Sequence, residues 1–310
     1  MHQSVLLSEI VESLRPARDD GTLVDATIGL GGHAEALLDR YPSTRLLGID
    51  RDPQALAASA ARLERFGNRV TLAQGRHETL IDILKKQNIE LVSGLLADLG
   101  VSSMQLDDAS RGFSFRYDAP LDMRMGPESQ TAADLVNTLG EHELATILRD
   151  YGEEPMARRI AKAIVTARAE GTIETTVKLA EIVRSVKWSK PGQIDPATLT
   201  FQALRIAANE ELIGLDKFID DAVEVLEPNA RIAIISFHSL EDRIVKRALR
   251  RLEGECTCPP NLPVCGCGAK EVVEILTSRP VTASEEEVQR NPRSRSAKLR
   301  VAEKLLAVSS

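Results

Sequence analysis

A short apolar strand that runs into a glycine-rich turn constrains this chain more than any other feature. Residues 23–33 read LVDATIGLGGH, and a second apolar run, residues 46–50, reads LLGID and ends in an acid. At such a turn glycine permits positive φ and close approach of a ligand, and the acid that ends the second strand accepts ribose hydroxyls. The pattern predicts a doubly wound α/β domain that binds an adenosine-containing ligand.

The details of the turn favour one kind of ligand. Gly29, Gly31 and Gly32 do not complete the G-x-G-x-x-G pattern that turns helix N–H groups toward a dinucleotide pyrophosphate, and no Walker lysine follows them. The first strand instead carries Asp25, and Asp50 ends the second. Acids at both strands favour a cationic sulfonium ligand, S-adenosylmethionine, over NAD or ATP. A strand–turn–helix without a ligand is the alternative.

A third acid follows a third apolar strand. Residues 91–97 are apolar enough for a buried parallel strand, and Asp98 comes directly after them. Because ligands of open α/β sheets bind outside the carboxyl ends of the strands, we expect Asp25, Asp50 and Asp98 to share that edge. The alternative for each acid taken singly is a helix N-cap.

Hydrophobic periodicity predicts two domains. Apolar residues at helical spacing, separated by Gly140, Gly152 and Gly171, fill residues 105–200. A Rossmann-like domain of residues 1–104 and 201–310 is therefore interrupted by an all-helical domain of residues 105–200, and Asp195-Pro196 is expected to begin the helix that re-enters the main domain. We expect parallel strands near residues 22–26, 45–49, 69–73, 91–97 and 230–236, and a closing antiparallel pair near 272–277 and 298–303.

Aromatic and arginine residues alternate at the start of the predicted insertion. Phe113, Phe115 and Tyr117 lie within five residues, and Arg111, Arg116 and Arg124 flank them. Interleaved aromatic and guanidinium groups suit an unstacked base and its phosphates, although a half-buried strand has the same alternation. Basic runs at 246–251 and 293–300, the latter with Arg293 and Arg295, are solvated faces or parts of the same binding surface.

The chain resembles the bacterial RsmH (MraW) methyltransferases across nearly its whole length. The resemblance is carried, in the family's order, by residues 4–7, 25–33, 49–53, 98–103, 111–115, 121–125, 151–154, 200–206, 236–243 and 291–293. Departures are Met104 where proline is usual, Ala119 where glycine is usual and His77 where an aromatic residue is common.

The resemblance implies a Rossmann-like, class I S-adenosylmethionine-dependent methyltransferase that methylates N4 of a cytidine in 16S rRNA of the small ribosomal subunit. It assigns Gly31, Gly32, His33, Asp50, His77, Asp98 and Gln105 to the cofactor site, to which the strand pattern adds Asp25 and Gly29. Asp98 would accept hydrogens of the target amine. The sequence leaves open whether Asp98 contacts the amine, the cofactor or both. His238, after the fifth strand, would line the target-base pocket or act as a structural hydrogen-bonding group.

Composition agrees with this reading. The chain has 310 residues, 43% hydrophobic and 27% charged, without an apolar run long enough for a membrane span or a signal peptide, so we expect a cytoplasmic protein. A net charge of −7 restricts any contact with RNA to a local basic patch. The sequence leaves open whether the chain acts as a monomer or as a homodimer.

Two other functions share parts of this pattern. A DNA amino-methyltransferase uses the same chemistry on duplex DNA. A catalytically silent RNA-binding protein of ribosome assembly would keep the fold, although intact acids at Asp25, Asp50 and Asp98 weigh against it.

The cysteines form a cluster: Cys256, Cys258, Cys265 and Cys267. Disulfides are rare in cytosolic proteins, and four thiolates satisfy tetrahedral Zn²⁺, so the spacing favours a structural zinc site. C-x-C pairs are less typical of zinc sites than C-x-x-C pairs. Relatives of this family lack the segment, which indicates that the metal takes no part in the reaction.

Metal analysis of the protein purified under reducing conditions should therefore find about one zinc per chain. The double substitution Cys256→Ser with Cys265→Ser should lose the metal and retain most activity at low temperature, because a closed tetrahedral site has no open position for a substrate atom. Zinc-free wild-type protein would contradict the hypothesis.

Overall fold

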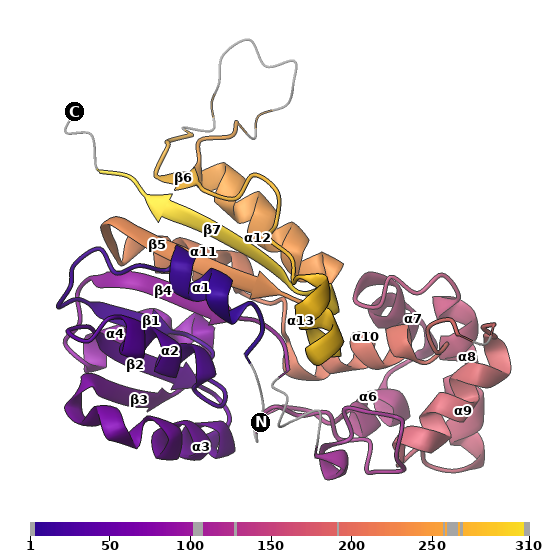
Figure 1. Cartoon of the computed structure of the whole chain (residues 1–310). Helices are drawn as coiled ribbons and strands as arrows, with labels where there is room; N and C mark the ends of the chain where they lie inside the picture. The colour runs from indigo at the N-terminus through magenta and orange to yellow at the C-terminus, as the bar shows by residue number, and fades with distance from the viewer. Residues whose placement is uncertain are drawn as a thin grey trace. The chain divides into compact units, whose positions relative to one another are not determined.

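The computed structural model describes residues 4–101, 108–126, 129–190, 192–256, 258, 266 and 269–306. Its contacts group into two compact units (Figure 1). The first joins Met1–Gly100 with Ile213–Ser310, and the second is Val101–Leu212.

The first unit is built on a seven-stranded sheet of order β3-β2-β1-β4-β5-β7-β6. The strands from β3 to β5 are parallel, whereas β7 pairs antiparallel with both β5 and β6. This confirms the predicted α/β fold class, each predicted strand and the antiparallel closing pair. The strand bounds are β1 Thr22–Asp25, β2 Arg45–Asp50, β3 Val70–Gln74, β4 Val92–Asp98, β5 Leu226–Ser236, β6 Val273–Ile275 and β7 Lys298–Lys304.

Helices cover both faces of this sheet because alternate strand residues point to opposite sides. Ile232 and Ile234 of β5 pack in one core with α4 (Leu80–Lys86), α11 (Leu215–Glu224) and α12 (Ser239–Leu252). Ala233 and Ile235 pack in another core with α1 (Leu7–Ser13) and α2 (Gly32–Arg40). In a third, smaller core α2 packs against α3 (Pro53–Leu63). The short helix α13 (Glu285–Arg290) precedes β7.

The second unit is helical around its own core. Its helices are α6 (Ala132–Thr138), α7 (Glu141–Asp150), α8 (Ala157–Glu170), α9 (Thr176–Val186) and α10 (Thr198–Asn209). Their buried residues, such as Leu148, Ile164 and Val183, stand at the helical spacing seen in the sequence. No helix in the described part of either unit has both the length and the apolar character to cross a membrane.

The position of α10 differs from the sequence expectation. We expected the helix after Asp195-Pro196 to belong to the main domain, but Phe201, Leu204 and Ala208 of α10 pack in the helical core. The units divide at residues 100/101 and 212/213 rather than at 104/105 and 200/201. Ala197, not Asp195, is the N-cap of α10, and the Asp195 carboxylate accepts a hydrogen bond from the Ala197 N–H at 2.9 Å.

Candidate active site

Three aspartates end three neighbouring strands of the sheet in the first unit. Asp25 ends β1, Asp50 ends β2 and Asp98 ends β4, and β1 lies between the other two. Helices α2 and α3, which follow β1 and β2, pack on one face of the sheet, whereas α4 and α11 pack on the other face. The edge between β1 and β4 is therefore a topological switch point, where open α/β sheets bind ligands. The predicted placement of the three acids at one edge is therefore confirmed.

Asp25 is the most enclosed of the three carboxylates. It is 1% exposed, and its Oδ1 accepts a hydrogen bond from the Thr27 N–H at 3.2 Å. Burial raises the pKa of Asp25 to about 7, the Thr27 hydrogen bond opposes this shift, and the nearby Asp50 charge adds to it. A buried carboxylate with this pKa gains stability from a positive charge placed beside it.

Asp98 faces His33 across the start of α2. Nδ1 of His33 lies 3.8 Å from Oδ2 of Asp98, while Nε2 of His33 lies 2.8 Å from the Val5 carbonyl oxygen. Because a carbonyl only accepts hydrogen bonds, Nε2 of His33 carries a proton, and Nδ1 is the ring nitrogen that faces Asp98.

The Asp98 carboxyl has an unused hydrogen-bonding atom. Its Oδ1 is buried and has no hydrogen-bond partner among the described residues. Burial raises the pKa of Asp98 well above its ordinary value, and the charges of Asp25 and Glu241 add to the shift. A buried acceptor of this kind is costly unless a ligand completes it.

Asp50 and the glycines shape the turn between β1 and α2. The two Asp50 carboxylate oxygens accept hydrogen bonds at 2.9 Å, one from the Gly29 N–H and one from the Asp52 N–H. Each oxygen keeps a second lone pair for a ligand hydroxyl. Burial raises the pKa of Asp50, and the two backbone hydrogen bonds oppose the rise. Gly31 caps α2 at φ 73°, in the left-handed region that favours glycine.

His77 stands beyond the end of β3, at the same sheet edge. Its ring meets Phe218 edge to face, with ring centroids 4.9 Å apart, and its Nε2 is buried without a hydrogen-bond partner in the described part of the chain. Burial lowers the pKa of His77, so the ring is neutral at pH 7. A neutral ring with an available polar atom suits contact with a heteroaromatic ligand.

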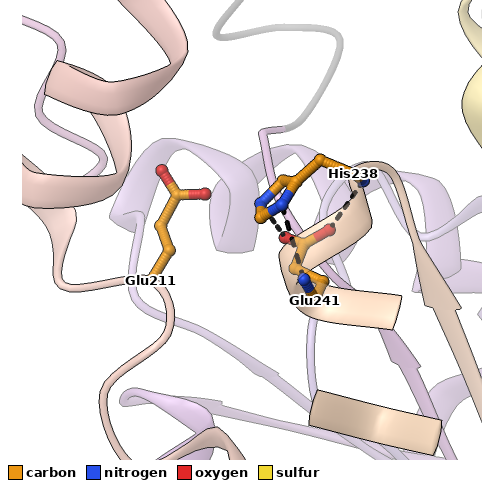
Figure 2. Close-up of side chains that lie close together, drawn as sticks. All are labelled: Glu211, His238 and Glu241. Atoms are coloured by element: carbon orange, nitrogen blue, oxygen red, sulfur yellow. Dashed lines mark hydrogen bonds and ion pairs between the residues drawn. The ribbon is translucent and has the colours of Figure 1, made fainter. Parts of the chain in front are cut away.

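His238 caps a helix. It is the N-cap of α12, and its Nδ1 accepts a hydrogen bond from the Glu241 N–H at 3.4 Å while its Nε2 lies 3.1 Å from Oε1 of Glu241 (Figure 2). The third side chain in Figure 2, Glu211, belongs to the helical unit, where it forms an ion pair with Arg205 at 2.9 Å. Since both ring nitrogens of His238 face Glu241, the geometry favours the structural of its two expected roles.

The aromatic residues at 113–117 do not form the predicted binding strip. Phe113 is 9% exposed and packs in the helical core, and Phe115 meets Phe201 edge to face at 4.8 Å. Only Tyr117, 68% exposed, is open to a base. We therefore correct the expectation that Phe113 stacks on RNA, because its ring is enclosed by the helices; nor do residues 113–117 form a strand.

Two of the predicted substrate arginines hold the loop that contains these aromatics. Arg111 donates hydrogen bonds to the carbonyls of Arg124 and Met125 at 2.9 and 3.3 Å. Arg124 forms a two-pronged ion pair with Asp122, with distances of 2.7 and 2.8 Å. Both guanidinium groups thus serve the local structure, and a role in substrate binding stays a prediction.

Arg293 and Arg295 belong to the same unit as the three aspartates. Both are exposed in the short 3-10 helix Pro292–Ser296, which directly precedes β7. Since Lys298 of β7 pairs with Ser236 at the carboxyl end of β5, this helix lies at the same sheet edge as the three aspartates.

Several predicted residues fall outside the described part of the chain. These are Gln105, Met104, Cys265 and Cys267. Cys256 is exposed and Cys258 partly so. The zinc site therefore stays a prediction.

The N-terminal segment supports the site in a way that the sequence analysis did not foresee. The Val5 carbonyl holds the His33 ring, and Gly32 packs against Ser4, whose hydroxyl oxygen would lie 2.1 Å from a Cβ on Gly32. Thr27 was also missed: its hydroxyl oxygen accepts a hydrogen bond from the Asp98 N–H at 2.6 Å. The match of residues 4–7 to a family motif was the one signal available.

Comparison with known proteins places this site in a family. The profile of the MraW methylase family matches residues 1–305. The chain belongs to the MraW methylase family. It is 50% identical to the ribosomal RNA small subunit methyltransferase H of Pelobacter propionicus, over 98% of both chains. The proteins of the same name from Geobacter sulfurreducens and Heliobacterium mobile are 50% and 47% identical, each over 98% of this chain and 99% of the relative.

Asp25 should make the protein less stable as the pH rises from about 4 to about 7. The unfolded carboxyl ionises near pH 4, whereas the folded one keeps its proton until about pH 7, so the folded state binds more protons in this window. The free energy of unfolding should fall by up to about 1.4 kcal/mol per pH unit through this group alone. Urea unfolding at pH 5 and pH 7.5 should show a smaller fall in Asp25→Asn than in wild type; an equal fall would refute the shift.

Phe113 should behave as a core residue. Phe113→Ala should lower the free energy of unfolding by about 3–5 kcal/mol, while Tyr117→Ala should change it by less than about 0.5 kcal/mol. Denaturant titration measures both. A Phe113→Ala protein of wild-type stability that binds RNA poorly would restore the stacking role.

Proposed function

We propose that the chain transfers a methyl group from S-adenosylmethionine to the N4 amine of a cytidine in 16S rRNA of the small ribosomal subunit. The observation that carries the proposal is identity near 50%, over 98% of the chain, to proteins named ribosomal RNA small subunit methyltransferase H. The switch-point acids and the glycine turn supply an edge suited to such a donor.

The residues at the edge fit S-adenosylmethionine. The Asp50 carboxylate oxygens have lone pairs that suit ribose hydroxyls. His77, which follows β3, offers a neutral ring whose Nε2 is buried. Burial raises the pKa values of Asp25 and Asp98, so a bound cation beside them would favour their ionised forms and gain affinity from them. The bound donor supplies an electrophilic methyl group on a sulfonium.

The target amine of cytosine is a weak nucleophile, so its reaction depends on groups of the protein. The lone pair of a cytosine amine is delocalised into the ring, so the amine must be held in line with the methyl group and must give up hydrogens as it becomes cationic. Positioning of this kind is worth about 7–11 kcal/mol. Asp98 is the group that we assign to the amine, because its Oδ1 is a buried acceptor without a partner among the described residues.

His33 positions Asp98. With its Nε2 proton donated to the Val5 carbonyl, His33 holds its Nδ1 3.8 Å from Oδ2 of Asp98. The charge state of Asp98 decides whether this carboxyl accepts hydrogens from an amine. Positive charge at the edge favours the ionised form, which accepts hydrogens from an amine.

The substrate base has to leave its stack to reach this edge, because the acids lie at strand ends that a stacked base does not enter. Arg293 and Arg295, exposed at the same edge, are suited to phosphates that flank the base. An rRNA substrate also implies that the protein works in the cytoplasm.

The proposal is tested by transfer of labelled methyl from S-adenosylmethionine to small subunits, free rRNA and duplex DNA in parallel. Transfer to DNA alone would favour a DNA amino-methyltransferase. No transfer to any of them, with RNA binding retained, would favour a silent assembly protein.

Asp98→Asn should lower kcat for methyl transfer by about 10²–10³-fold, the usual loss for one preorganised polar group in an active site. Its affinity for S-adenosylmethionine, measured by calorimetry, should change far less than kcat does. The control is Asp20→Asn, which makes the same charge change at an exposed position of the same unit and should leave kcat unchanged. Full activity in Asp98→Asn would remove Asp98 from the reaction.

A further inference from the structure

A small pocket in the first unit lies away from the three aspartates. It is a cavity of about 150 Å³ between α12 and the segment that follows β6. Leu249 and Ile275 give it an apolar side, and Lys246, Arg250 and Ser278 contribute exposed polar groups. None of these residues takes part in the site described above.

The charge around this pocket is positive, in a chain whose net charge is −7. Lys246 has no ion pair among the described residues, and Arg250 reaches only Glu255, at 3.8 Å between two exposed side chains. Ion pairs at that distance and exposure contribute little. Both cations are therefore available to a ligand.

The acids near the pocket are already engaged. Asp242 forms ion pairs with Arg300 at 2.7 Å and with Lys298 at 3.2 Å, which hold the pKa of its carboxyl below the ordinary value. Glu253, which lines the pocket, accepts a hydrogen bond from the Ile275 N–H at 3.0 Å. Glu253 keeps its negative charge, so three cations of the lining, Lys246, Arg250 and Arg300, face one carboxylate of the lining.

The same helix connects the pocket to the candidate active site. α12 begins after His238, at the carboxyl end of β5, and Lys246 and Arg250 follow eight and twelve residues later. At 1.5 Å per residue these cations stand about 12 and 18 Å along the helix. A strand of RNA whose base enters the edge would carry neighbouring phosphates over this distance.

We propose that the pocket between α12 and the segment after β6 binds a backbone phosphate of the substrate RNA, on a nucleotide near the one that is methylated. Lys246, Arg250 and the Ser278 hydroxyl donate to the phosphate oxygens, and the apolar side formed by Leu249 and Ile275 packs against the attached ribose. The inference rests on the proposed function, because it takes RNA as the substrate.

The test compares three double variants. Lys246→Ala with Arg250→Ala removes both cations, and Lys246→Arg with Arg250→Lys keeps both charges. Lys85→Ala with Lys86→Ala makes the same charge change at exposed positions in the last turn of α4. For each we would measure melting temperature, S-adenosylmethionine affinity, KM for small-subunit RNA and the salt dependence of RNA binding.

Removing the two pocket cations should raise KM for RNA about tenfold and reduce the slope of log affinity against log salt by about 0.7, the value for one neutralised phosphate of a single strand. Melting temperature, kcat and S-adenosylmethionine affinity should stay at wild-type values. The charge-keeping variant should remain near wild type in KM and slope.

An unchanged KM and slope would overturn the proposal, and so would an equal change in the Lys85 and Lys86 variant, which would reveal a general effect of net charge. Saturable binding of inorganic phosphate that does not compete with RNA would assign the pocket to a small anion instead. If the wild type transfers no methyl group to RNA, the proposed function fails, while the salt slopes still decide whether RNA contacts this pocket.

Discussion

Three poorly solvated carboxyl groups at one sheet edge are the constraint on which the rest of the site depends. Asp25, Asp50 and Asp98 end adjacent strands, and burial raises the pKa of each. Burial makes the ionised form of each carboxyl costly, and the charges of neighbouring acids add to that cost. A positively charged ligand favours the ionised carboxylates and relieves this cost. The arrangement therefore lowers the stability of the free protein and raises its affinity for such a ligand.

The surrounding elements keep that arrangement in place. The N-terminal segment lies over the edge, where Val5 fixes the His33 ring and the Leu6 N–H donates to the Glu287 carboxylate of α13 at 2.8 Å. Gly32 admits this segment because it has no Cβ. Residues from the two ends of the chain thereby meet beside the Asp98 carboxyl, which explains why family motifs are spread over the whole sequence.

The first unit keeps the cations of α12 apart from the carboxylates at the strand ends, whereas Arg293 and Arg295 are exposed at the same edge as those carboxylates. Carboxylates gather at the ends of the parallel strands, whereas the cations of α12 stand along the outside of the helix that begins beside them. Such a division attracts a cationic donor and a polyanionic substrate to different parts of one surface. It also reconciles an acidic protein with an RNA substrate, because the basic groups are concentrated rather than numerous.

The sequence by itself determined the sheet, the helical insertion and the common edge of Asp25, Asp50 and Asp98, because strand periodicity and the positions of glycines and acids are local information. Only the tertiary structure decided the burial of Phe113, the capping role of His238 and the membership of α10 in the helical unit. These depend on which distant segments pack together. Alternation of aromatic and basic residues looks the same whether the aromatic face meets RNA or helices that follow later in the chain.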